Sequence, residues 1–198
     1  IALPYQLTED DKQRLQQVFG RKAARQAAGN PMSEEEMWIE IARVYKTAEM
    51  KPAVFARFVR TDPAVLRSTI IFVETKEYGN RILPILDTYT HLYRTYYAED
   101  ERENLLEFAK AKIDCLVTCH RISQGIDIKG LRNVVLFASA RAKLETIQRI
   151  GRCLRTDASN PTKRASVVDF VRDDMGGFPN ADTERADWLR ALSNVKHE

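Results

Sequence analysis

The sequence predicts an α/β fold in three layers, with a parallel sheet covered by helices on both faces and preceded by a helical segment. From residue 68 onward, short runs of β-branched and apolar residues alternate with segments at helical spacing. Such alternation favours right-handed crossovers between parallel strands. Before residue 68, apolar residues recur only at helical spacing. The 198 residues, 44% hydrophobic and 30% charged, suffice for one core-forming domain and an appendage.

Each of the first two predicted helices starts with a capping-box pattern, Thr8 with Asp11 and Ser33 with Glu36. In such a box the two side chains bond each other's backbone amides at the start of a helix. The sequence Gly29-Asn30-Pro31 is a clear stop for the first helix. We expect three helices here, over residues 8–28, 33–48 and 53–59, and no strand in this first third of the chain.

The central part of the chain supplies the sheet. We expect strands over residues 69–73, 91–93, 114–118, 133–138 and 166–171. The second is the weakest, because its tyrosines and arginines also fit a loop. The expected helices cover residues 78–86, 99–111, 121–124, 141–150 and 182–192. These elements divide the chain into a connector and helical segment (1–66), a sheet domain (67–175) and a C-terminal loop and helix (176–198).

Composition limits the class of protein. The net charge is only +3, so contact with nucleic acid would need local clusters of basic residues. The chain has no run of about 18 apolar residues and no signal-peptide pattern, so we expect a cytoplasmic protein without a membrane partner. Cys115, Cys119 and Cys153 lie in apolar contexts and are expected to be reduced core thiols, with no metal site. Since residue 1 is not methionine, we expect a piece of a longer protein.

The most informative segment is Gln-Arg-Ile-Gly-Arg-Cys-Leu-Arg, residues 148–155. In a helix, Gln148, Arg152 and Arg155 fall within roughly 60° of one another on one face. The adjoining face is apolar, with Ile147, Ile150 and Leu154. Two guanidinium groups held side by side repel each other, so their pairing favours an anion between them. A phosphate chain is the obvious candidate.

This octet resembles the last conserved motif of superfamily 2 helicases and translocases, Gln- or His-Arg-x-Gly-Arg-x-x-Arg. About twenty residues earlier, residues 116–128 resemble the helicase motif that ends in Gly-Ile-Asp. Gly125 would allow a close backbone approach, and Asp127 could accept hydrogen bonds from a ribose hydroxyl. Taken alone, this segment also fits an ordinary turn with a capping aspartate.

Three further segments resemble the same family more loosely. Residues 72–76 and 101–108 resemble the opening strand and the Glu-Arg-x-x-x-Leu-x-x-Phe helix of its C-terminal motor domain. Residues 3–8 resemble the connector between the two motor domains in the branch of restriction-enzyme motors and excision-repair helicases. The resemblance therefore implies a C-terminal RecA-like motor domain.

In that family, ATP and Mg²⁺ are held mainly by an N-terminal RecA-like domain, which would be the partner of this chain. The resemblance makes Arg152, Arg155 and Gln148 the catalytic residues at the γ-phosphate, and assigns Gly125 and Asp127 to nucleotide binding. The chain has no Gly-x-x-x-x-Gly-Lys-Ser/Thr loop and no Asp-Glu motif. We therefore expect this fragment alone not to hydrolyse ATP.

The resemblance also implies a nucleic-acid track, formed by Thr75, Lys76, Thr118 and Arg121, with double-stranded DNA as the expected partner. The family often has Thr-Asp where this chain has Cys119-His120, so Thr118 or Arg121 takes the place of that threonine. Thr75 and Lys76 also fit a helix cap and a solvated turn.

Two other functions fit parts of the sequence. One is a non-enzymatic helicase-like module that grips nucleic acid or a partner through a basic track, formed by Lys76, Arg94, Arg102 and Arg121. The other is a doubly wound nucleotide-binding enzyme, which is disfavoured because no Gly-rich loop follows the first strand.

Overall fold

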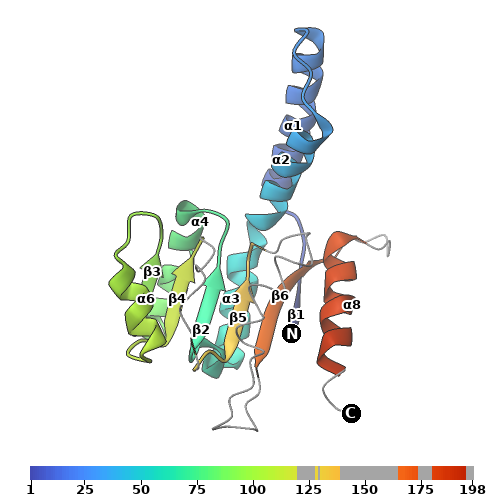
Figure 1. Ribbon diagram of the computed structural model, residues 1–198. Coiled ribbons are helices and arrows are strands. Elements are labelled where there is room, and N and C mark those ends of the chain that lie inside the picture. The colour runs from blue at the N-terminus through green and yellow to red at the C-terminus, as the bar shows by residue number, and fades with distance from the viewer. Residues whose placement is uncertain (120–127, 129, 139–164, 174–179, 195–198) are drawn as a thin grey trace.

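A six-stranded parallel sheet is the centre of the computed structural model, which describes residues 1–119, 128, 130–138, 165–173 and 180–194 (Figure 1). The strand order is β1-β6-β5-β2-β4-β3, and every neighbouring pair is parallel. The strands are β1 (Ala2–Tyr5), β2 (Thr69–Phe72), β3 (Tyr93–Tyr96), β4 (Cys115–Thr118), β5 (Asn133–Leu136) and β6 (Ser166–Arg172). The predicted α/β fold is confirmed.

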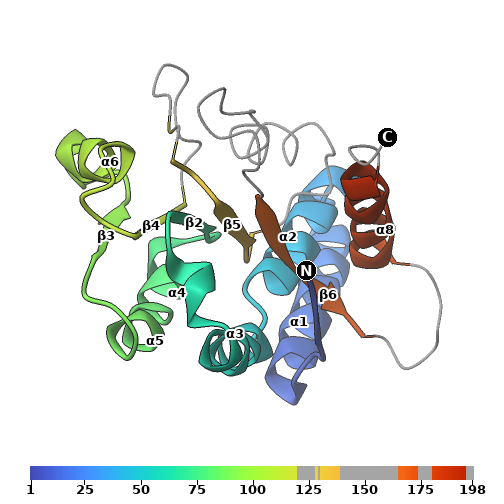
Figure 2. The same ribbon diagram turned by 90° about the horizontal axis from the view of Figure 1, so that it is seen from below.

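Helices cover both faces of this sheet (Figure 2). One face carries α3 (Met50–Thr61), α4 (Lys76–Asn80) and α5 (Leu83–Asp87), and the other carries α6 (Arg102–Ala109) and α8 (Ala181–Asn194). Successive side chains of β2 alternate between the two cores, with Ile71 in the first and Ile70 in the second. This double burial explains why the strand is a continuous apolar run.

The first third of the chain does contain a strand, so the expectation of helices alone is wrong. β1 pairs with β6 in the register Ala2↔Asp169 and Tyr5↔Arg172. It escaped prediction because its four residues include Pro4 and its partner strand lies over 160 residues later. The domain boundary predicted at residue 66 stays a prediction. β1 and α3 lie before that residue, but they share the sheet and the core with the central part of the chain.

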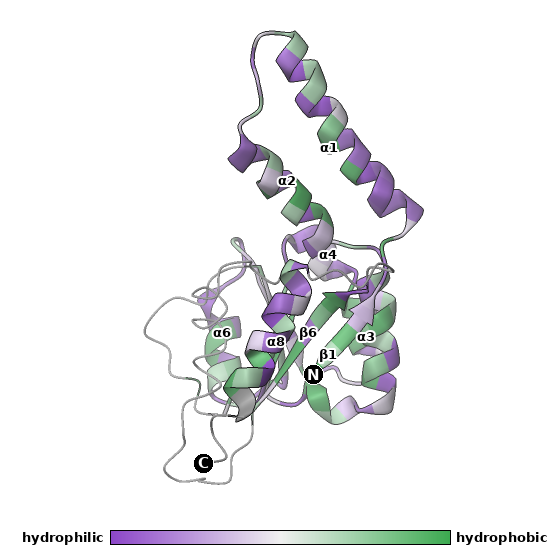
Figure 3. Cartoon of the chain, turned by 90° about the vertical axis from the view of Figure 1, so that its right-hand side faces the viewer, coloured by the Kyte–Doolittle hydropathy of each residue, from purple (hydrophilic) through white to green (hydrophobic). Residues whose placement is uncertain are grey.

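Two antiparallel helices, α1 (Glu9–Ala27) and α2 (Glu34–Lys46), form an arm that stands away from the carboxyl edge of the sheet (Figures 1 and 3). Both predicted capping boxes are present, at Thr8 and Ser33. Gly29 follows α1 with φ of 74°, a conformation that suits glycine at a helix end. The arm has its own small core, formed by Val18, Met32, Met37 and Ile41.

The remaining elements differ little from prediction. The expected helix over 78–86 is divided into α4 and α5, with Pro84 in the first turn of α5. A short 3₁₀ helix, η1 (Pro63–Leu66), precedes β2. The weakest predicted strand exists as the edge strand β3, shifted toward Tyr96. The expected helices over 121–124 and 141–150 lie outside the described residues. Among the described helices, none has the length and apolar character needed to cross a bilayer.

Candidate nucleotide and nucleic-acid site

The predicted site residues follow strands whose carboxyl ends meet at one edge of the sheet. β2 lies between β4 and β5, and Phe72 is in register with both Thr118 and Leu136. The loops after these three strands therefore start side by side, as expected for a ligand-binding edge of a parallel sheet. The arm rises from the same edge, because β1 leads directly into α1 (Figure 1).

Thr75 and Lys76 begin α4 just beyond β2. The hydroxyl of Thr75 accepts a hydrogen bond from the Tyr78 amide at 3.2 Å, so Thr75 is the helix cap that the sequence allowed. Lys76 forms an ion pair with Glu99 from the loop after β3, and both side chains are about half exposed. An exposed pair contributes little to stability and can exchange its carboxylate for a phosphate oxygen.

Thr118 is fully buried at the end of β4, and its hydroxyl donates a hydrogen bond to the Tyr96 carbonyl at 2.7 Å. A buried and bonded hydroxyl cannot reach a nucleic-acid backbone in this arrangement. The predicted nucleic-acid contact by Thr118 is therefore not supported, and its side chain instead ties β4 to β3.

A close approach between Gly79 and Tyr97 fixes the loop after β3 against α4. Tyr97 is 3% exposed, and a Cβ added to Gly79 would lie 2.1 Å from its hydroxyl oxygen. Burial raises the pKa of this phenol, which therefore stays protonated. The adjacent Cys119 is a free, half-buried thiol whose pKa is also raised by burial, and Cys115 is free and buried. Cys153 lies outside the described residues.

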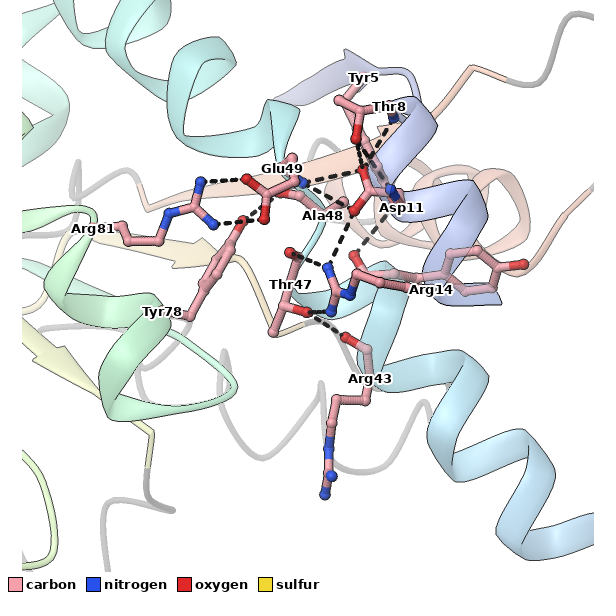
Figure 4. A network of polar contacts seen from close by, with 11 residues as sticks. Tyr5, Thr8, Asp11, Arg14, Arg43, Thr47, Ala48, Glu49, Tyr78 and Arg81 are labelled. Atoms are coloured by element: carbon pink, nitrogen blue, oxygen red, sulfur yellow. Dashed lines mark hydrogen bonds and ion pairs between the residues drawn. The ribbon is translucent and has the colours of Figure 1, made fainter. Parts of the chain in front are cut away.

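Charged and polar side chains hold the base of the arm together and join it to the segment between α2 and α3 (Figure 4). Asp11 is fully buried and accepts hydrogen bonds from the amides of Thr8 and Glu49 and from the Arg14 guanidinium. Arg14 also donates to the carbonyl and hydroxyl of Thr47. Asp11 therefore joins the start of α1 to the segment between α2 and α3.

Further contacts connect the arm base to the loop after β2. Glu49 accepts two hydrogen bonds from Arg81, at 2.8 and 2.6 Å, and this pairing lowers the pKa of the Glu49 carboxyl. The Tyr78 hydroxyl donates to the Ala48 carbonyl at 2.7 Å (Figure 4). Glu74, the acidic residue just after β2, is 3.1 Å from Lys46 of α2. Because Lys46 compensates the negative charge of Glu74, this edge of the sheet is compatible with a phosphate-bearing ligand.

The residues expected at the nucleotide lie outside the described part of the chain. They are Gly125, Asp127, Gln148, Arg152 and Arg155, and Arg121, expected on the nucleic-acid track, also lies outside it. Their roles stay predictions. Phe137 and Ala138, which follow β5 and precede residues 148–155 in the sequence, are hydrogen-bonded to the end of β2. Among the described residues, no three His, Cys, Asp or Glu side chains are grouped to hold a metal ion.

Residues 51–157 match the family described as the helicase conserved C-terminal domain, which is over half of the chain. The chain belongs to this family. The match begins at Lys51, after the arm. The general resemblance to superfamily 2 helicases is therefore confirmed.

Two curated relatives are ATP-dependent RNA helicases. DBP6 of Meyerozyma guilliermondii is 26% identical over 118 residues, which are 54% of this chain and 18% of the relative. The mitochondrial MRH4 of Scheffersomyces stipitis is 25% identical over 142 residues, 61% of this chain and 24% of the relative. The chain thus spans about a fifth of the length of these proteins. Neither relative supports the restriction-enzyme and excision-repair branch.

Solved structures with the same fold include domains of DEAD-box proteins. The C-terminal domain of Dbp5 has a TM-score of 0.53 at 19% identity, covering 74% of this chain and 80% of that one. S. cerevisiae Dbp5 bound to RNA and ADP BeF3 has a TM-score of 0.52 at 18% identity, covering 71% of this chain and 36% of that one. These similarities show that the RecA-like fold is shared.

Sequence reasoning missed the burial of two charged residues beside this edge, Asp11 and Lys51. Asp11 was expected as a cap but also holds α3 through Glu49. Lys51 is 2% exposed and follows Ala48 by three residues on the apolar stripe that continues to Phe55. A lysine on an apolar stripe at helical spacing is the signal that could have found it.

Proposed function

We propose that this chain is the second motor domain of an ATP-dependent helicase or translocase. The family match and the convergence of three strand ends at one edge support this most directly. In the proposal, ATP and Mg²⁺ bind mainly to an N-terminal RecA-like domain, and this chain closes over them. Gly125 and Asp127 would face the ribose, and Arg152, Arg155 and Gln148 the γ-phosphate.

The chain's own part in the reaction would be electrostatic. Arg152 and Arg155 would bring fixed positive charge to phosphoryl oxygens as charge builds in the transition state. Such arginines contribute on the order of 10³ or more in rate. When hydrolysis removes their anionic partner, the two domains separate, and this opening and closing would move nucleic acid along the carboxyl edge.

RNA is the nucleic acid to test first, because the curated relatives named above are RNA helicases. Double-stranded DNA, which the connector suggested, is the competing substrate. Lys76 would contact the phosphate backbone by exchanging its ion pair with Glu99.

The non-enzymatic alternative has less support than the motor. Two members of its basic track, Lys76 and Arg94, are in partly exposed ion pairs with Glu99 and Glu107, the latter at 3.5 Å, and a phosphate can displace either carboxylate. These contacts fit both functions. The alternative, however, gives no reason for the arginine octet.

The direct test is ATP hydrolysis by the intact protein, measured without nucleic acid, with single-stranded RNA and with double-stranded DNA. We expect magnesium-dependent hydrolysis that RNA stimulates at least severalfold, and no hydrolysis by residues 1–198 alone. Stimulation by DNA only would retain the motor and reject RNA. Binding of nucleic acid without any hydrolysis would reject the motor and favour the binding module.

A further inference from the structure

Lys51, the second residue of α3, is a buried cation beneath the carboxyl edge of the sheet. Its side chain is 2% exposed, and its ammonium group donates a hydrogen bond to the Phe137 carbonyl at 3.0 Å. The ammonium nitrogen also lies 4.9 Å from the ring centroid of Tyr5 and 5.6 Å from that of Phe170. One charge therefore contacts residues of β1 and β6 and the residue that follows β5.

Packing alone does not explain a lysine at this position. Removing an ammonium group from water is costly, and the positive end of a helix dipole adds to that cost. Within the described residues, no carboxylate forms an ion pair with Lys51. Burial lowers its pKa to about 8, the carboxylates of Asp182, Asp169 and Asp11 oppose this change, and Arg185 adds to it. Lys51 therefore carries a desolvation cost that an apolar side chain would not.

The contacts of Lys51 join parts of the chain that lie far apart in sequence. Tyr5 is the last residue of β1, which leads into the arm. Phe137 follows β5 and precedes the segment with Gln148, Arg152 and Arg155. Two residues before Lys51, Glu49 is bound to Arg81 near the start of α5. Lys51 thus lies where the arm base meets the exit of β5.

We propose that Lys51 is a positioning residue, whose ammonium group fixes the exit of β5 against β1 and β6 and so sets where the arginine segment begins. This inference rests on the proposed function for its effect on catalysis. The arrangement depends on charge, because only the protonated amine attracts the faces of the Tyr5 and Phe170 rings. Loss of the proton leaves a weaker hydrogen bond to the Phe137 carbonyl.

The catalytic test compares Lys51→Met with Lys112→Met, which removes an exposed lysine, in the intact protein. Misplaced catalytic groups lower turnover more than binding, so Lys51→Met should lower kcat for ATP hydrolysis about tenfold and leave KM within twofold. Wild-type kcat should fall as the pH rises through about 8, and Lys51→Met should lack that inflection. A kcat within twofold of wild type, with an unchanged pH profile, would overturn the proposal.

A second measurement needs neither hydrolysis nor a folded variant. In wild-type protein labelled with ¹³C, the Lys51 ε-carbon and the Phe137 carbonyl should titrate with one midpoint near pH 8. A Phe137 carbonyl shift that does not follow Lys51 would overturn the positioning role. If the intact protein hydrolyses no ATP but this joint titration is present, the proposed function fails while the contact between Lys51 and the exit of β5 stands.

Discussion

The arm base and the edge beside β2 and β4 both consist of charged side chains, but they differ in burial. At the arm base, Asp11 is fully buried and has fixed partners in Thr8, Arg14 and Glu49 (Figure 4). At the edge, Lys76 and Glu99 remain about half exposed and pair only with each other in the contacts described above. Charged residues with several buried partners hold the structure together, whereas exposed pairs stay available to a ligand.

This difference assigns separate tasks to the two regions. The arm base should determine stability, because a buried carboxylate that loses its donors keeps an uncompensated charge. The edge should determine binding, because its residues can exchange partners at little cost. Substitutions in each region test whether stability and binding are separated in this way.

The largest stability effect is expected at Asp11. Replacing Asp11 with alanine removes the acceptor for four donor groups and should lower the free energy of unfolding by about 3 kcal/mol. Urea unfolding of the purified chain measures this change. Asp10→Ala, in the same helical turn but exposed, is the control and should change it by less than about 0.5 kcal/mol. Equal effects of the two substitutions would contradict the role of the buried network.

A smaller loss is expected at Gly79, where the edge is closely packed. In Gly79→Ala the new methyl group would meet the Tyr97 hydroxyl, and the resulting strain should cost about 1–3 kcal/mol. Gly20→Ala, in the open middle of α1, should instead stabilise the chain by about 0.5–1 kcal/mol. Thermal unfolding of both variants compares them directly, and stabilisation by both would show that Tyr97 can move aside.

Lys76→Ala should weaken binding without affecting stability. Losing one phosphate contact should reduce the affinity of the intact protein for RNA about three- to tenfold and lower the salt dependence of binding by about one unit of slope. Fluorescence anisotropy at several salt concentrations measures both quantities. Lys112→Ala, which removes another exposed lysine, is the control. An unchanged salt slope would exclude Lys76 from the track.

The smallest effect is expected at Glu49, where the side chain is about one-third exposed. Glu49→Gln should cost no more than about 1 kcal/mol at pH 7 because solvent screens the pair with Arg81. Arg81 lowers the folded-state pKa of Glu49 below 4.5, so the contribution is complete above that pH and is lost as the pH falls through the lower value. The difference in unfolding free energy between variant and wild type should therefore be largest at pH 7 and should shrink as the pH is lowered below 4.5.

Local signals predicted most of the fold. The apolar run of β2 and the capping boxes at Thr8 and Ser33 each depend on residues close in sequence, and each is present. β1 was missed because its strand character comes from pairing with β6, far along the chain. β3 was only approximate because it lies at the edge of the sheet, where its side chains are half-buried or exposed.

The site was less predictable than the fold for the same reason. Sequence spacing placed Thr75, Lys76 and Thr118 at one edge, which the register of β2 with β4 confirms. Spacing could not show that the Thr118 hydroxyl donates a hydrogen bond to the Tyr96 carbonyl, or that the Lys51 ammonium donates one to the Phe137 carbonyl. Each of these bonds joins residues that are far apart in sequence. Burial and partners follow from tertiary structure, while residue type and order follow from sequence.

In the proposed function, Arg152 delivers charge to ATP bound by a neighbouring domain. The most direct measurement is ATP hydrolysis and ATP binding by Arg152→Ala in the intact protein, beside Arg57→Ala, which removes an exposed arginine of α3. We expect Arg152→Ala to lose about 10³-fold in kcat while its affinity for ATP changes only a few fold. Retained hydrolysis, or an equal loss of binding and hydrolysis, would exclude this role of Arg152.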